Sequence, residues 1–390
     1  MGKFVDLATK ILEQCKALEE NTSSEHLAQW DEFPDVQLTG PAIMAKLAAQ
    51  STLLELQVAM KTPTETVTTL GMRTVTPMVF QALYRFGIAE KVPTEHDASY
   101  EDVAKACRLP EQDLRRIVRY LMTWNVFTEP QPNRVAHNGS SRAFRENKLL
   151  QQTIGMCTEE IWPSAVHGSS IANSTELDFF QEISKYPTRA KRFADGMTFM
   201  GGMPGLGMEP LVGAYNWDAL GEATVVDVGG SHGELAKRLL LKYPKLSFVI
   251  QDLSSTIDGG HQQSRLSFME HNFFDKQPVQ ADAYMFRWIF HDWPDKACTK
   301  ILQNLIPALK QGARILIMDF CVPEPSQAPR MAEELERTFD LTMWCLNNAK
   351  ERSKEEWSIL IKQADTRFKL ENIIMIPGSL LSILDIKWDG

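Results

Sequence analysis

Hydrophobic residues in the second half of the chain form short unbroken runs and helical stripes in alternation. Residues 223–228 are rich in β-branched side chains, which is typical of a buried parallel strand. A glycine-containing turn follows, and the apolar positions of residues 234–241 then recur at helical spacing. A second apolar run over residues 246–251 ends at Asp252. This order of strand, turn, helix and strand predicts an α/β domain over residues 213–390.

Helical stripes predominate in the first half of the chain. Residues 4–20 and 41–61 each carry apolar side chains on one helical face, and a polar, proline-containing link separates them. Isolated helices need a surface that covers their apolar faces. We expect a second copy of the chain to cover residues 1–70, with packing on the same chain as the alternative. Residues 71–148 follow the order helix, turn, helix, hairpin, which predicts a winged-helix domain.

A winged helix often binds DNA, and three arginines lie on its longer predicted helix: Arg115, Arg116 and Arg119. Four acidic side chains accompany them, namely Glu101, Asp102, Glu111 and Asp113. Because no strongly basic face results, we interpret the domain as a scaffold for dimerisation and for lining a pocket. DNA binding is the less favoured alternative.

Residues 149–212 form a predicted helical segment rich in methionine and aromatic side chains. Four of the chain's 17 methionines fall within residues 197–208. Methionine is flexible and polarizable, so a cluster of this kind suits a pocket for a flat apolar ligand. Ordinary core packing is the alternative for each side chain. The predicted substrate-binding residues here are Met156, Trp162, Met197 and Met200.

Composition and charge exclude several classes of function. The net charge of −9 argues against broad binding to nucleic acid or to anionic membranes. The sequence contains no apolar run as long as a membrane span and no signal-peptide core near residue 1. The six cysteines are scattered without a Cys-x-x-Cys pair, which is typical of reduced thiols. We therefore expect a cytoplasmic protein with no metal site.

The glycine turn differs from a phosphate loop because no Lys-Ser or Lys-Thr pair follows it. Gly229, Gly230 and Gly233 let the backbone turn sharply and approach a ligand. Asp252 lies about 20 residues further on, where such folds place a carboxylate on a ribose. Asp227 would repel a pyrophosphate but could accept an ammonium group. This favours S-adenosylmethionine (SAM) over a dinucleotide, and a turn that merely packs a helix is the alternative.

A further predicted strand, residues 283–287, ends just before a polar cluster that contains His291. Open α/β sheets place their chemistry at such strand ends. A histidine can take a proton from a phenol near neutral pH, and a carboxylate must then hold its tautomer. Asp319, at the end of the next predicted strand, and Glu351 are the two candidates. A histidine satisfied within the core is the alternative.

Together these motifs resemble the plant and fungal class I, SAM-dependent O-methyltransferases of small aromatic metabolites. The resemblance covers the chain from about residue 70 to its end. It implies an α/β fold with a Rossmann-like SAM-binding domain and a mostly parallel sheet, preceded by a helical dimerisation region and a winged helix. Its Phe-Arg-Trp version is closer to fungal members from polyketide or related pathways. The segments that carry it are 227–233, 251–253, 286–295 and 350–357.

The resemblance implies a role for each matching position around the cofactor. The glycine turn would contact the methionine part of SAM, and Asp252 would bind the ribose hydroxyls. Asn272 and Phe273 would border the adenine, and Arg287 would complete the pocket. The family usually has Asp where Asn272 stands, so an amide replaces one acceptor for the adenine amino group. The predicted cofactor-binding residues are Asp227, Gly229, Gly230, Gly233, Asp252, Asn272, Phe273 and Arg287.

The resemblance also makes His291 the general base, oriented by Asp319 and Glu351, and it adds Trp288 to the substrate-binding residues. It implies a homodimer whose winged helices close the partner's pocket. The predicted reaction is transfer of the SAM methyl group to a phenolic or enolic hydroxyl of a small aromatic metabolite. A SAM-binding pericyclase or isomerase on the same scaffold is the alternative, and a SAM-sensing regulator is a third. Retention of His291 with both acids favours methyl transfer, because a pericyclic reaction requires no general base.

Overall fold

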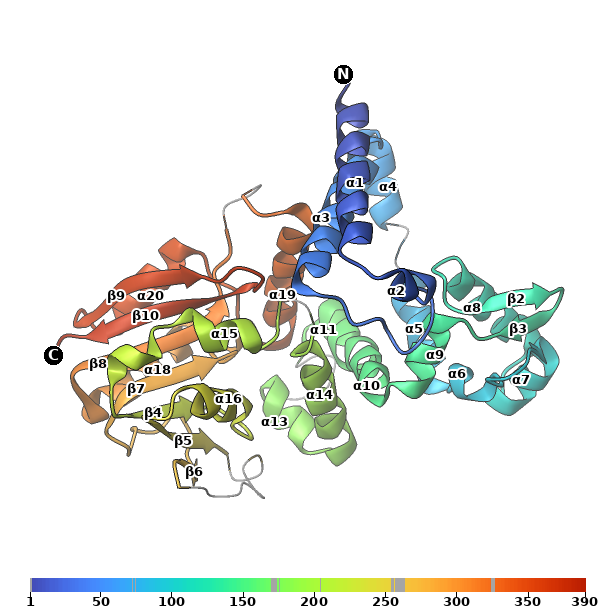
Figure 1. Ribbon diagram of the computed structural model, residues 1–390. Helices are drawn as coiled ribbons and strands as arrows, with labels where there is room; N and C mark the ends of the chain where they lie inside the picture. The colour runs from blue at the N-terminus through green and yellow to red at the C-terminus, as the bar shows by residue number, and fades with distance from the viewer. Residues whose placement is uncertain are drawn as a thin grey trace. The chain divides into compact units, whose positions relative to one another are not determined.

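A computed structural model describes most of the chain (Figure 1). The described chain divides into two compact units, and the four segments expected from the sequence stay a prediction within this division. The first unit is Met1–Met200 with Pro329–Met331, and the second is Gly201–Ala328 with Ala332–Gly390. The described residues are 2–71, 73, 75–169, 174, 176–203, 205–253, 256, 264–323 and 327–390.

The first unit begins with the helices expected over residues 4–20 and 41–61, and the structure confirms both. They are α1 (Lys3–Glu20), α2 (Ser24–Ala28), α3 (Gly40–Ala59) and α4 (Pro63–Gly71). α1 packs along α3. Large apolar side chains on these helices nevertheless stay exposed, namely Phe4, Val5, Leu12, Leu27, Met44, Leu53, Val67 and Leu70.

The winged-helix order of helices and hairpin is also confirmed. It comprises α5 (Val75–Arg85), α6 (Ile88–Lys91), β1 (Ala98–Ser99), α7 (Tyr100–Cys107), α8 (Glu111–Met122), β2 (Thr128–Gln131) and β3 (Arg134–Ala136). The strands pair antiparallel in the order β1-β3-β2. Buried Leu83, Val103 and Leu114 belong to its core. The three arginines of α8 pair with Glu111, Asp113 and Glu129, which neutralises the charge of this face.

Further helices complete the first unit. They are α9 (Gly139–Glu146), α10 (Lys148–Met156), the π-helical turn η2 (Cys157–Ile161), α11 (Trp162–His167), α13 (Phe179–Ser184) and α14 (Pro187–Met200). α10 packs against α14 at two glycines. A Cβ at Gly196 would lie 3.0 Å from Met156 Sδ, and one at Gly155 would lie 2.8 Å from Arg192 Cδ of α14. Met156 is 1% exposed, so it contributes to this packing.

The second unit is built on the mostly parallel sheet expected from the sequence. Its strands are β4 (Ala223–Val228), β5 (Leu246–Asp252), β6 (Leu266–Glu270), β7 (Ala281–Arg287), β8 (Leu309–Phe320), β9 (Phe368–Met375) and β10 (Leu381–Trp388). They run in the order β6-β5-β4-β7-β8-β10-β9. β6, β5, β4, β7 and β8 pair parallel, whereas β10 runs antiparallel to both β8 and β9.

The second unit also contains helices, several of which pack against this sheet or against one another (Figure 1). They are α15 (Glu209–Ala214), η3 (Trp217–Leu220), α16 (Glu234–Lys242), η4 (Phe290–Asp292), α18 (Asp295–Leu305), η5 (Ile306–Ala308), α19 (Arg330–Asn347) and α20 (Lys354–Ala364). α18 and α20 pack side by side, and buried side chains such as Leu302 and Trp357 join the core of the sheet. α20 begins with a capping box formed by Ser353 and Glu356, which fixes the point where the helix starts.

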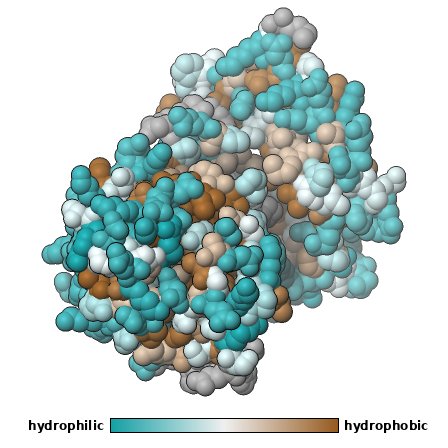
Figure 2. Space-filling model, turned by 60° about the vertical axis from the view of Figure 1, so that its left-hand side comes forward, coloured by the Kyte–Doolittle hydropathy of each residue, from teal (hydrophilic) through white to brown (hydrophobic). Residues whose placement is uncertain are grey.

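The surface of the molecule is mixed in character. Hydrophilic side chains cover much of the face drawn in Figure 2, and apolar side chains interrupt them in patches. Within the described part of the chain, none of the helices has the length and apolar character that crossing a membrane requires.

Candidate active site

Polar residues gather where the parallel strands end. The glycine turn follows β4, Asp252 ends β5, Arg287 ends β7 and Asp319 lies one residue before the end of β8. Because β5, β4, β7 and β8 are parallel neighbours, their carboxyl ends meet at one edge of the sheet. Such an edge is the usual ligand site of an open α/β sheet.

The glycine turn is held against β5 by its own backbone. The amides of Gly229 and Gly230 donate to the carbonyl of Gln251 at 2.7 and 3.1 Å. A Cβ at Gly229 would collide with Ile289, and one at Gly230 would collide with the Asp227 carboxyl group. Gly229 also has φ of 74°, a conformation that favours glycine. The turn therefore requires glycine at both positions.

The Asp252 carboxylate is directed toward this turn. Its Oδ2 accepts a hydrogen bond from the Ser231 amide at 2.9 Å, and its Oδ1 accepts one from the Leu253 amide at 2.8 Å. Burial raises the pKa of Asp252 while these hydrogen bonds oppose the shift. The buried side-chain amides of Gln251 and Gln277 form two hydrogen bonds with each other, both 2.8 Å long, and these hold the end of β5 in place.

Asp227 in β4 and Arg287 at the end of β7 are two ionisable side chains at this edge of the sheet, and each affects the pKa of the other. Burial raises the pKa of Asp227 to about 7, although the charge of Arg287 opposes it. Burial likewise lowers the pKa of Arg287 to about 10. The Arg287 guanidinium donates to the Leu206 carbonyl at 3.2 Å and stacks over the Trp288 ring. Its buried Nε has no hydrogen-bond partner among the described residues.

The residues expected to border an adenine follow β6. Asn272 is exposed, and its side-chain oxygen accepts a hydrogen bond from the Phe274 amide at 3.0 Å. The Phe273 ring meets the Trp293 ring edge to face, with centroids 5.9 Å apart. Phe273 therefore lies beside the turn that carries His291.

His291 lies in η4, directly after β7, and is 3% exposed. Its Nδ1 lies 2.7 Å from Oε1 of Glu351, which is 4% exposed. Burial lowers the pKa of His291, but the negative charges of Glu351 and Asp292 outweigh burial and raise it to about 10. The structure thus brings together a buried imidazole and a buried carboxylate that are 60 residues apart in the sequence.

Two further carboxyl groups lie near the imidazole. Asp319 is fully buried and its Oδ2 accepts a hydrogen bond from the Phe290 amide at 3.1 Å, so it holds the turn rather than the ring. Burial raises the pKa of Asp319 to about 7. Asp292 Oδ1 lies 3.7 Å from His291 Nε2, and burial raises the pKa of Asp292 to about 6. Of the two carboxylates expected to hold the imidazole, Glu351 makes the direct bond.

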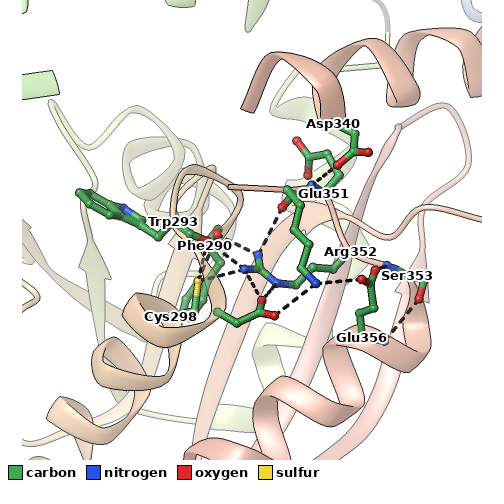
Figure 3. A network of polar contacts seen from close by, with 10 residues as sticks. Phe290, Trp293, Cys298, Asp340, Glu351, Arg352, Ser353 and Glu356 are labelled. Atoms are coloured by element: carbon green, nitrogen blue, oxygen red, sulfur yellow. Dashed lines mark hydrogen bonds and ion pairs between the residues drawn. The ribbon is translucent and has the colours of Figure 1, made fainter. Parts of the chain in front are cut away.

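Arg352 joins the segment that carries Glu351 to the turn that carries His291 (Figure 3). Its guanidinium donates to the carbonyls of Phe290 and Trp293, both at 2.9 Å, and to Asp295 Oδ1 at 2.8 Å. Lys350 pairs with the same Asp295 at 3.2 Å. The sequence motif that contains Arg352 indicates a role for its glutamate, but a local pattern does not reveal that its arginine is buried.

The predicted substrate contacts are divided between the two units. Trp288 directly follows β7, and its φ of 55° is a strained conformation for a bulky residue. Trp162 begins α11, and Met197 and Met200 lie in the last turn of α14, while Met156 ends α10. Their roles in binding substrate stay a prediction.

Comparison with known proteins agrees with this geometry. Residues 149–367 match the O-methyltransferase domain family. The grayanic acid biosynthesis cluster O-methyltransferase of Cladonia grayi is 35% identical over 363 residues, which cover 91% of this chain and 80% of that protein. O-methyltransferase kk1A of Curvularia clavata is 33% identical over 412 residues, which cover 99% and 98% of the two chains.

Solved structures share the fold at lower identity. The crystal structure of OxaC in complex with SAH and oxaline has a TM-score of 0.78 at 20% identity and covers 99% of both chains. A pericyclic reaction enzyme has a TM-score of 0.73 at 21% identity and covers 99% of this chain and 100% of its own. From the family match and the sequence relatives, the chain belongs to the O-methyltransferase family and is a SAM-dependent O-methyltransferase.

Proposed function

We propose that this enzyme methylates a phenolic or enolic hydroxyl of a small aromatic secondary metabolite, of polyketide type, with His291 as the general base. The geometry of His291 carries the proposal. Its Nδ1 is bound to Glu351 at 2.7 Å, which leaves Nε2 as the nitrogen that can take a proton. The relative from the grayanic acid cluster supports a metabolite substrate.

The carboxylates would act on the base in two ways. A carboxylate at Nδ1 holds the tautomer in which Nε2 carries no proton, so Glu351 prepares the imidazole to accept one. Asp319 would hold the turn through the Phe290 amide and add negative charge beside the ring. A positioned base of this kind contributes about 10²–10⁴-fold to the rate.

The residues at the sheet edge fit SAM. The close approach that Gly229 and Gly230 permit suits the methionine part, and Asp252 suits the ribose hydroxyls. The unpartnered Nε of Arg287 is a buried donor that suits a carboxylate. When bound, SAM supplies an electrophilic methyl group. The remaining proposed contacts are Asp227, Gly233, Asn272 and Phe273.

We also propose a cytoplasmic homodimer that assembles through residues 1–70 and the winged helix. The exposed apolar side chains of α1, α3 and α4 support this, because such surfaces favour a partner. All six cysteines are free thiols, as expected in a reducing compartment. The proposed substrate contacts are Met156, Trp162, Met197, Met200 and Trp288.

One experiment separates methyl transfer from pericyclic catalysis on the same scaffold. The protein is incubated with SAM and a panel of mono- and dihydroxylated aromatic compounds, and products are followed by mass spectrometry. Methyl transfer gives S-adenosylhomocysteine and a product heavier by one CH₂ unit in equal amounts. Conversion of an acceptor without S-adenosylhomocysteine would instead support a pericyclase or isomerase.

A further inference from the structure

Arg352 contacts the turn of His291 on both sides of the base. The guanidinium of Arg352 reaches the carbonyl of Phe290, one residue before His291, and that of Trp293, two residues after it. Both distances are 2.9 Å, and the side chain of Arg352 is fully buried. The short turn that carries the base is therefore held at its two ends by one rigid, planar group.

Glu351 and Arg352 both form hydrogen bonds to the turn of His291, but to different groups of it. Glu351 holds the ring of His291, whereas Arg352 holds the backbone around it. The segment itself is anchored independently, because the Val322 amide donates to the Arg352 carbonyl at 3.0 Å. The distance between the imidazole and the Glu351 carboxylate consequently depends on where Arg352 places the turn.

We propose that Arg352 is a positioning residue that sets the alignment of His291 with Glu351 by fixing the carbonyls of Phe290 and Trp293. This inference rests on the proposed role of His291 as the general base. Among the described residues, Arg352 makes no hydrogen bond to the imidazole or to the residues proposed to bind SAM, so it acts on His291 through the turn.

The chemistry of the site favours arginine over a hydrophobic or lysine side chain. A buried charge is costly unless every donor is satisfied, and here one carboxylate, three carbonyls and the Cys298 sulfur accept from the guanidinium. The Arg352 guanidinium also lies over the Trp357 ring, with its Cζ 5.2 Å from the ring centroid. This contact helps to fix the plane of the guanidinium. A lysine ammonium is a compact point charge and does not span the same set of acceptors.

The test compares Arg352→Lys and Arg352→Met with wild type in kcat, in SAM affinity by calorimetry, and in the pH dependence of kcat. We expect kcat to fall at least 10-fold while SAM affinity changes less than 3-fold, on the order of the effect of loosening a catalytic geometry. The acidic limb of the profile should move to lower pH, as it should in Glu351→Gln, because a loosened carboxylate stabilises the protonated imidazole less.

The matched control is Arg314→Lys. Arg314 lies in β8 and pairs with Asp385 and Glu371, so this variant loses an equally well-paired guanidinium away from the turn. The acidic limb of its kcat profile should lie at the same pH as in wild type. If Arg352→Met does not fold, Asp295→Asn provides the second measurement. It leaves Arg352 in place and removes the carboxylate that orients its guanidinium and also pairs with Lys350, so it should shift the acidic limb in the same direction by less.

The outcomes test the positioning role of Arg352 separately from the role of His291 as the general base. A wild-type limb in both Arg352→Lys and Asp295→Asn, with activity lost only in proportion to the folded fraction, would overturn the positioning role. A limb that moves to higher pH would also overturn it, since that direction reports only the loss of a nearby positive charge. If His291→Ala keeps wild-type activity, the proposed base is wrong, whatever the Arg352 variants do.

Discussion

Replacement of Glu351 by glutamine tests the base most directly, because it keeps the shape of the side chain and removes its charge. In the folded protein the negative charges around His291 outweigh burial and raise the pKa of the imidazole to about 10. The proposed base accepts a proton only when it is unprotonated, so activity should rise as the pH rises through that value. Glu351→Gln should lower the pKa of His291 and move the acidic limb to lower pH.

The size of the change follows from the contact that is lost. The bond from His291 to Glu351 is 2.7 Å long and fully buried. A hydrogen bond to a charged group contributes about 1.5–3 kcal/mol. Since about 1.4 kcal/mol corresponds to one pH unit, the limb should move by about 1–2 units. The same loss of imidazolium stabilisation in the transition state should lower kcat on the plateau by about 10–100-fold.

The assay is the rate of S-adenosylhomocysteine formation at saturating SAM and acceptor between about pH 6 and 11.5, a range that extends above the pKa of about 10 of His291 and the ordinary pKa of a phenol. Glu355→Gln, which changes an exposed glutamate four residues further on, is the control and should match wild type. If Glu351→Gln lowers the rate without moving the acidic limb, Glu351 does not act on the protonation of His291.

Three further changes test the remaining parts of the site and the assembly. His291→Ala should lower turnover by about 10²–10⁴-fold with SAM affinity nearly intact by calorimetry, and the loss should shrink near pH 10, where a phenol ionises unaided; an undiminished rate would contradict the assignment. Asp252→Ala should weaken SAM binding by tens-fold or more, because the carboxylate also accepts the Ser231 amide and orders the glycine turn; unchanged affinity would remove the ribose assignment. Deletion of residues 1–60 should cause aggregation or loss of activity in size-exclusion and rate measurements, and a well-behaved active monomer would rule out dimerisation through these helices.

Much of the fold follows from local periodicity. The runs that became β4, β5 and β7 are apolar because both faces of these strands are buried, and period and length identify them without tertiary information. The order of strands across the sheet is different in kind. That β10 inserts antiparallel between β8 and β9 depends on pairings between distant segments, which no local pattern specifies.

The site could be predicted as a set of residues but not as an arrangement. The sequence places Asp319 and Glu351 equally well beside His291, yet in the structure Asp319 bonds the Phe290 amide and Glu351 bonds the ring. The burial of Arg352 is equally invisible in the sequence, because arginine is usually exposed and the acceptors that join it to the turn of His291 are the backbone carbonyls of Phe290 and Trp293. Backbone acceptors carry no residue identity, so they leave no sequence signal.

The carboxyl groups around His291 explain how a buried base can hold a proton. When a hydroxyl proton reaches Nε2, the ring becomes positive in a place that is 3% exposed, and an unpaired charge there would cost several kcal/mol. Glu351 pairs with that charge directly, and Asp292 lies 3.7 Å from Nε2. Asp319 adds negative charge near the ring, and burial raises the pKa of Asp319 to about 7. The proton affinity of the proposed base therefore comes from fixed neighbours rather than from solvent, and it depends on how rigidly the turn of His291 is held against Glu351.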